Sequence, residues 1–258
     1  MLMPVRPRGW WFDAALLAGF VALTVALARG HLLALDVQVA DWVDAHRPAP
    51  LYWMSRVLNY LGQGGQVLMS TSILLAGLVA WRRRSVRPVL VIVVAFLVTF
   101  VTIGPLKVWL DRAAPHFAGP DREILFNPAA DGPVAMSYPS GHVANALAWY
   151  AVIAVLLSAL LRSLDRPPLS PRANAALRVL PPVIVFFTTT YLAFHWITDS
   201  VAGLLLGLIL ARVLTRIPWD AIPLPRLPNG IDRPAGLDDP VAAGVRAVRA
   251  RRLRASRA

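Results

Sequence analysis

The segment PVLVIVVAFLVTFVTIGPLKVWL, residues 88–110, decides the fold class, because it is apolar throughout except for Lys107. A helix crosses the hydrocarbon core of a bilayer with ~20 apolar residues, which this segment provides. Five further segments have the same character, at about 12–34, 64–81, 142–162, 177–196 and 199–215. The sequence therefore predicts an all-α polytopic membrane protein with six transmembrane helices.

The composition supports this class. Hydrophobic residues make up 57% of the 258 residues, charged residues 16%, and the mean hydropathy is +0.57, whereas soluble domains carry about a quarter charged residues. The net charge is +12, and the charged residues lie between the apolar segments. We therefore expect contact with anionic lipid and no nucleic-acid partner. The absence of cysteine excludes disulfides, thiolate nucleophiles and cysteine metal sites.

We expect two parts in the chain: a six-helix domain over residues 1–217 and a basic tail over 218–258, rich in proline and arginine. The end of the tail gathers Arg246, Arg249, Arg251, Arg252, Arg254 and Arg257. This composition predicts a segment that is disordered or lies on anionic lipid.

The first apolar segment has two interpretations. Arg6 and Arg8 precede it, and Ala26-Leu27-Ala28 fits the small-residue pattern of a signal-peptide cleavage site. The apolar character continues beyond Ala28, however, which favours a retained helix.

The arginine-rich connections predict the orientation. They lie at 82–87, at 162–178 and after 215, and the positive-inside rule places all three in the cytoplasm. We therefore expect a multi-pass protein of the cell membrane with both termini in the cytoplasm. The connections 35–63, 111–141 and 196–198 then face outward.

Two further patterns bear on packing. The segment 38–60 carries Trp42, Trp53 and Tyr60 and predicts an interfacial amphipathic piece. Gly203 and Gly207 form a small-xxx-small pair, which favours close helix packing within the chain over dimerisation. The oligomeric state is left open.

Four ionisable residues fall at the predicted outer face, namely Lys107, His142, His195 and Asp199. Ionisable groups at membrane depth are costly and usually functional. Lys107 is the only lysine in a chain that otherwise uses arginine. A compact ammonium suits phosphate binding, and the alternative is a lysine that snorkels to the interface.

The stretch YPSGH, residues 138–142, predicts the start of a helix with Ser140 as its N-cap. The free N–H groups of a helix start attract anions, and Gly141 lets a ligand approach the backbone closely. His142 would then stand beside the bound anion. Ordinary capping without a ligand is the alternative.

The stretch HWITD places His195 and Asp199 four residues apart. On a helix they would face each other, and the carboxylate would orient the imidazole so that its other nitrogen can attack or accept a proton. A structural ion pair is the alternative. Two histidines and an aspartate could also bind zinc, but Asp199 suits the orienting role and Lys107 would repel a cation, so we expect neither a metal nor another cofactor.

These motifs resemble the type 2 phosphatidic acid phosphatase superfamily, whose pattern is Lys-x6-Arg-Pro, then Pro-Ser-Gly-His, then Ser-Arg-x5-His-x3-Asp. The resemblance covers about residues 57–215. Lys107 and Pro115 match the first motif, 139–142 the second completely, and His195 and Asp199 the end of the third.

Two positions depart from the pattern. Ala114 replaces the arginine before Pro115, and Thr189 replaces the arginine six residues before His195, with Thr188 at the serine position. In the family those arginines grip the phosphoryl oxygens. Arg112 stands two residues before Ala114, where many members have an additional arginine, and we expect it to take over part of that role.

The resemblance implies an extracytoplasmic phosphatase, independent of metal, that acts on a lipid phosphate or pyrophosphate monoester. His195 would attack phosphorus, Asp199 would orient it, and His142 would protonate the leaving oxygen and then activate water. Phosphate contacts are expected from Lys107, Arg112, Ser140 and Gly141.

Two other functions stay open. The missing arginines favour a phosphotransferase similar to the sphingomyelin-synthase-like and inositolphosphorylceramide-synthase-like enzymes, which keep the His-His-Asp triad. A lipid-phosphate binder without catalysis is the third possibility. The lipid head group and tail are not readable from the sequence.

Overall fold

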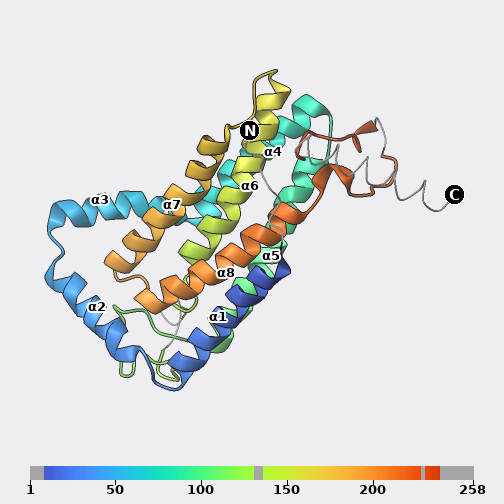
Figure 1. The fold of residues 1–258 in the computed structure, drawn as a ribbon. Helices are drawn as coiled ribbons and strands as arrows, with labels where there is room; N and C mark the ends of the chain where they lie inside the picture. The colour runs from blue at the N-terminus through green and yellow to red at the C-terminus, as the bar shows by residue number, and fades with distance from the viewer. Residues whose placement is uncertain (1–8, 131–135, 228–229, 239–258) are drawn as a thin grey trace.

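The structure is a computed structural model that describes residues 9–130, 136–227 and 230–238. Within them the chain is helical, and the one extended pairing is an isolated bridge between Arg112 and Met136. The main helices, shown in Figure 1, are α1 (Trp10–Ala28), α2 (Leu33–Ala45), α3 (Ala49–Asn59), α4 (Ser70–Arg83), α5 (Arg87–Leu110), α6 (Gly141–Ser163), α7 (Pro171–Tyr191) and α8 (Ile197–Arg216). Short turns of helix occupy Tyr60–Gly62, Gly64–Met69 and Trp219–Ala221.

Six helices of the described chain are long and apolar enough to cross a membrane, as predicted. They are α1, α5, α6, α7, α8 and the continuous helix Gly64–Arg83 that includes α4. α6 is the central one: 67% of its apolar window is buried, compared with 22% for α1 and α5. α4, α5, α7 and α8 pack against α6, and α1 packs against α8 (Figure 1). This arrangement confirms the all-α membrane fold.

Three span boundaries differ clearly from the prediction. The fifth span ends at Tyr191 rather than near 196. The first helix ends at Ala28 rather than near 34, because Gly30 and Leu32 adopt positive φ angles of 79° and 68° and reverse the chain. The fifth starts at 171 rather than 177, because the Ser170 side chain accepts a hydrogen bond from the Ala173 N–H and Pro171 occupies the first turn. The end of α1 and the start of α7 are therefore determined by local turn and capping residues rather than by the extent of the apolar segment.

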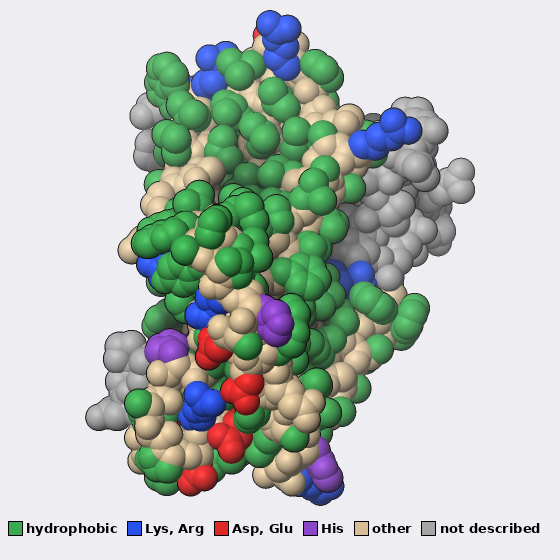
Figure 2. Space-filling view, turned by 90° about the vertical axis from the view of Figure 1, so that its left-hand side faces the viewer, with side chains coloured by type: hydrophobic (Ala, Val, Ile, Leu, Met, Phe, Trp, Pro, Cys, Tyr) green, Lys and Arg blue, Asp and Glu red, His purple; other side chains and the backbone are tan. Residues whose placement is uncertain are grey.

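The expected interfacial piece 38–60 consists of two helices, α2 and α3, which extend from one side of the bundle (Figure 1). Trp42 and Trp53 are 59% and 63% exposed, as aromatic anchors at an interface would be. Figure 2 shows acidic side chains gathered low on this face and Lys and Arg side chains at its upper end.

The tail differs from the expected disordered or lipid-bound segment where the structure describes it. Arg87 donates hydrogen bonds to the carbonyls of Trp219, Ile222 and Asp232, and Trp219 is buried. Residues 219–238, apart from 228–229, therefore fold back onto the helix ends, because the buried Arg87 guanidinium needs these acceptors. The arginines from Arg246 to Arg257 lie outside the described residues.

α6 and α8 pack closely through the predicted glycine pair. A Cβ atom added to Gly203 would lie 2.5 Å from the Ser140 carbonyl oxygen, and one added to Gly207 would lie 2.9 Å from the Ala144 Cα. The two backbones are in contact, as the small-xxx-small pattern indicated. Because Ser140 precedes His142, this contact also fixes the helix start at the site.

We expect Gly203→Ala to lower the thermal unfolding midpoint of the purified protein, because the added methyl group meets backbone that cannot move aside. Overpacking of this kind costs ~1–3 kcal/mol. Gly77→Ala is the matched control, because a Cβ added to Gly77 meets nothing within 4 Å, and alanine is the better helix former. Equal midpoints for the two variants would contradict the close contact.

Candidate active site

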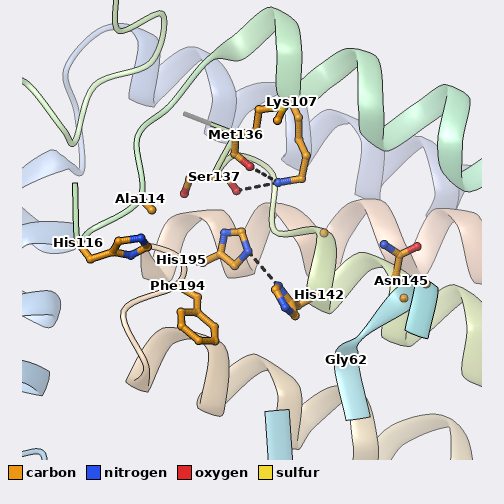
Figure 3. A pocket seen from close by; sticks show the side chains of 13 residues that line it. Gly62, Lys107, Ala114, His116, Met136, Ser137, His142, Asn145, Phe194 and His195 are labelled. Atoms are coloured by element: carbon orange, nitrogen blue, oxygen red, sulfur yellow. Dashed lines mark hydrogen bonds between the residues drawn. The ribbon is translucent and has the colours of Figure 1, made fainter. Parts of the chain in front are cut away.

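A cavity of about 440 Å³ opens where α5, α6 and the turn between α7 and α8 meet (Figure 3). Its lining combines three histidines, a lysine and a helix start. The lining residues are Gly62, Gly64, Gly65, Lys107, Ala114, His116, Met136, Ser137, Gly141, His142, Asn145, Phe194 and His195. The structure thus brings Lys107, Gly141, His142 and His195 together at one cavity, while Asp199 is not part of its lining.

His142 and His195 lie side by side at the cavity and are hydrogen-bonded to each other. His142 Nδ1 lies 3.3 Å from His195 Nε2, and the ring centroids are 5.4 Å apart. His142 stands in the first turn of α6, while His195 comes from the turn before α8. Both rings are therefore within reach of one phosphoryl group bound next to them in the cavity.

The expected helical register of His195 and Asp199 is wrong. Trp196 is the N-cap of α8, so His195 precedes the helix, and Asp199 reaches back to cap it by accepting a hydrogen bond from the Trp196 N–H at 3.0 Å. Asp199 Oδ2 also lies 3.6 Å from His195 Nδ1. The pair predicted from helix geometry thus forms through capping geometry instead.

Asp199 is completely buried and held from several sides. Its carboxylate accepts hydrogen bonds from Ser137 Oγ and from Arg112, whose Nη1 lies 2.6 Å from Asp199 Oδ1. Arg112 also pairs with the buried Asp36 of α2 at 2.6 Å, and both interact with Thr198. This network fixes the carboxylate behind His195, on the side away from the cavity.

Arg112 therefore differs from the expectation that it contacts phosphate. It is 0% exposed and does not line the cavity, because two buried carboxylates hold its guanidinium. Burial alone lowers the pKa of Arg112, but Asp199 and Asp36 outweigh it and raise the pKa. Arg112 thus stays charged and positions Asp199.

Ser140 has the predicted capping role and no place in the cavity lining. Its Oγ accepts a hydrogen bond from the Val143 N–H, its own N–H donates to the Asp199 carbonyl, and it is fully buried. Gly141 does line the cavity, and a Cβ there would lie 3.2 Å from Lys107 Cε. The cavity thus needs glycine at this position, as the close-approach argument expected.

Lys107 reaches the cavity from the last turn of α5. Its Nζ donates to the carbonyl oxygens of Met136 and Ser137 (Figure 3), the latter at 3.4 Å. An ammonium group has three donors, so one remains for a ligand.

Burial lowers the pKa of His195, although the Asp199 carboxylate opposes this effect. The imidazole is therefore neutral at physiological pH. A neutral ring that presents Nε2 to the cavity, with a carboxylate behind Nδ1, is suited to nucleophilic attack.

Of the two positions without the family arginines, one lines the cavity and the other is buried outside its lining. Ala114 lines the cavity, and Thr189 is fully buried with a hydroxyl that has no hydrogen-bond partner among the described residues. Neither supplies a cation.

Several lining residues were missed by sequence reasoning, His116, Asn145 and Phe194 among them. His116 directly follows the first motif, and Asn145 stands three residues after His142 on the same face of α6, so both carried a signal. Phe194 carried none, because its position depends on the turn before α8.

Comparison with known proteins agrees with this geometry. Phosphatidylglycerophosphatase B of Bacillus subtilis (strain 168) is 33% identical over 105 residues, which cover 41% of this chain and 45% of that protein. The chain thus spans about half the length of this curated relative.

The fold is also similar to the crystal structure of the first transmembrane PAP2 type phosphatidylglycerolphosphate phosphatase from Bacillus subtilis, with a TM-score of 0.63 and 22% identity. That match covers 78% of this chain and 93% of the other. The family model described as the PAP2 superfamily matches residues 88–223, which contain all three motifs. The chain therefore belongs to the PAP2 superfamily, the family that its motifs resemble.

Proposed function

We propose that the protein is a membrane phosphatase that hydrolyses a lipid phosphate or pyrophosphate monoester. One observation carries the proposal: His142 Nδ1 and His195 Nε2 lie 3.3 Å apart in a cavity that Lys107 also lines, and the Asp199 carboxylate stands 3.6 Å behind His195. A nucleophile, an acid–base partner, an orienting carboxylate and a cation are thus together.

The reaction follows from the two ring positions. The phosphoryl group binds next to the two histidines and replaces the hydrogen bond between them. His195 Nε2 attacks phosphorus while the bond to the lipid oxygen breaks, and protonated His142 gives its proton to that oxygen. His142 then takes a proton from water, the oxygen of which attacks phosphorus and breaks the P–N bond. Inorganic phosphate and neutral His195 result, and no metal takes part.

Binding of the phosphate group needs other sources of positive charge, because the two arginines of the family pattern are absent. Lys107 supplies one cation, and the helix start at Gly141 supplies N–H donors and the positive end of the α6 dipole. His116 and Asn145 add polar donors to the same cavity. His116 Nδ1 contacts the Ala193 carbonyl at 3.1 Å, which leaves Nε2 for a ligand.

We propose that Arg56 of α3 supplies the second cation. Its guanidinium carbon lies 5.6 Å from the centroid of the Phe194 ring, and that ring stacks with His142 at 6.1 Å. No hydrogen bond or ion pair occupies Arg56 within the described chain. An arginine free beside the catalytic rings can meet the charge of the lipid head group.

The name of the Bacillus subtilis relative makes phosphatidylglycerophosphate the first substrate to test. Polyprenyl pyrophosphate and phosphatidate follow. The site lies at the end of the bundle opposite the arginine-rich connection between α4 and α5. With that connection in the cytoplasm, the reaction takes place at the extracytoplasmic face.

Phosphotransfer is the second candidate, because Ala114 and Thr189 stand where a phosphatase of this family has arginines. A lipid or sugar hydroxyl would then replace water in the second step. A binder without catalysis is the third candidate, and any turnover that depends on His195 excludes it.

We expect His195→Ala to lower the release of phosphate from phosphatidylglycerophosphate by roughly a thousandfold or more, because the nucleophile is lost. His142→Ala should cost roughly 10²–10⁴-fold. His31→Gln is the control, because His31 is exposed and outside the cavity. Malachite-green phosphate release and thin-layer analysis of labelled lipid give the readout. Full activity of His195→Ala excludes the mechanism, and a new phospholipid without free phosphate assigns transfer.

We expect Arg56→Gln to raise the KM for the lipid phosphate by roughly tenfold, because one charge-assisted contact is worth ~1.5–3 kcal/mol. Neither arginine lines the cavity, but Arg56 contacts the lining residue Phe194. Arg29→Gln is the matched control, since Arg29 is exposed at the end of α1 and has no such ring contact among the described residues. Arg56→Lys should restore part of the affinity. Equal KM values for Arg56→Gln and Arg29→Gln would rule out this role for Arg56.

The pH profile of kcat/KM should fall on its acidic side below pH 6.5, the ordinary pKa of histidine. The reason is that burial lowers the pKa of His195, so the ring stays neutral and nucleophilic to lower pH. Phosphate release at a fixed, low substrate concentration, followed from pH 4.5 to 8, measures this acidic side of the profile. A limb centred above pH 7 contradicts a buried, neutral His195.

A further inference from the structure

A second cavity, of about 690 Å³, opens between α6, α7 and α8, away from the histidines. Its lining has two chemical ends. The inner part is apolar, with Pro182, Phe186, Leu204 and Leu208 among its residues. Asn174, Arg178, Arg212 and Thr215 line the other part. These four residues belong to the start of α7 and the end of α8, at the end of the bundle opposite the active site. We call this cavity the α7–α8 groove.

Arg178 is the unusual member of this lining. It is partly buried and stands about 10 Å along α7 from its first residue, at 1.5 Å per residue. In the described part of the chain, no hydrogen bond or ion pair engages its guanidinium. A charged group at membrane depth without a partner is costly.

The neighbouring charges do not satisfy Arg178. Arg212 pairs with Asp13 of α1, and its guanidinium also lies 4.8 Å from the Phe12 ring. Asp13 is therefore engaged by Arg212 and does not pair with Arg178. Two guanidinium groups line the polar end of the groove and no carboxylate does, so this end suits an anion.

We propose that the α7–α8 groove binds an anionic phospholipid, with its phosphate on Arg178 and an acyl chain along the apolar lining. Asn174 stands one turn before Arg178 on the same face of α7 and supplies an amide donor. The charged head group of such a lipid matches the polar end of the groove, and its acyl chain matches the apolar part. The site is independent of the proposed phosphatase reaction.

Titration of the lipid-stripped protein with phosphatidylglycerol or phosphatidylcholine of identical chains, read by native mass spectrometry, tests the proposal. We expect phosphatidylglycerol to bind roughly tenfold more tightly, and Arg178→Gln to remove that preference by loss of one charge-assisted contact. Arg172→Gln is the control, because Arg172 lies on the same helix but is exposed and outside the groove.

Two further variants separate this site from its alternatives. Leu208→Trp should fill the apolar part and weaken both lipids. Arg178→Gln should also remove the preference for phosphatidylglycerol in a protein that carries Lys107→Gln, because Lys107→Gln perturbs only the cavity that holds the histidines. Equal affinity of the wild type for both lipids, or no loss on Arg178→Gln, overturns the proposal. A dimer that Leu208→Trp converts to a monomer also overturns it and assigns the groove to a second copy of the chain.

Discussion

The site depends on the contacts that the buried Asp199 carboxylate makes. It caps α8 through the Trp196 N–H, accepts from Ser137, pairs with Arg112 and stands behind His195. A carboxylate that is 0% exposed must be paired, because an isolated buried charge is far more costly than a paired one. These partners come from two separate stretches of the chain, so satisfying one charge brings the connection between α5 and α6 and the turn before α8 together.

The same charge extends the network to the interfacial helices. Arg112 bridges Asp199 to Asp36 of α2, and Asp36 accepts from the Thr198 N–H and hydroxyl. α2 is therefore attached to the first turn of α8 by polar contacts rather than by apolar packing alone. Because α3 follows α2 directly, this attachment also determines where Arg56 lies against Phe194. The position of Arg56, which we propose to contact the lipid head group, thus depends on the Arg112–Asp36 ion pair, which does not line the cavity.

Much of the fold was predictable because the bilayer requires long apolar helices, and six such segments are visible in the sequence. The meeting of Lys107, His142 and His195 was also predictable, since the orientation of the spans places them at one face. The roles of Arg112 and Phe194 were not, because both depend on loops whose path is set by long-range pairing. The His195–Asp199 geometry was predicted in the wrong register, because spacing alone does not show whether a helix begins before or after His195.

The contrast between Arg112 and Ala114 follows from burial. Removal of Arg112 would leave Asp36 and Asp199 buried without their cation, and breaking a buried pair in this way costs ~3–5 kcal/mol. Position 114 faces the cavity, where water or substrate can solvate what an arginine would have contacted, so alanine there costs the fold little. The arginine that positions the Asp199 carboxylate is therefore needed for stability, whereas under the proposed function an arginine that contacts phosphate is needed only for activity. In that proposal, alanine at 114 and threonine at 189 change how substrate is bound and leave the Asp199–His195–His142 arrangement in place.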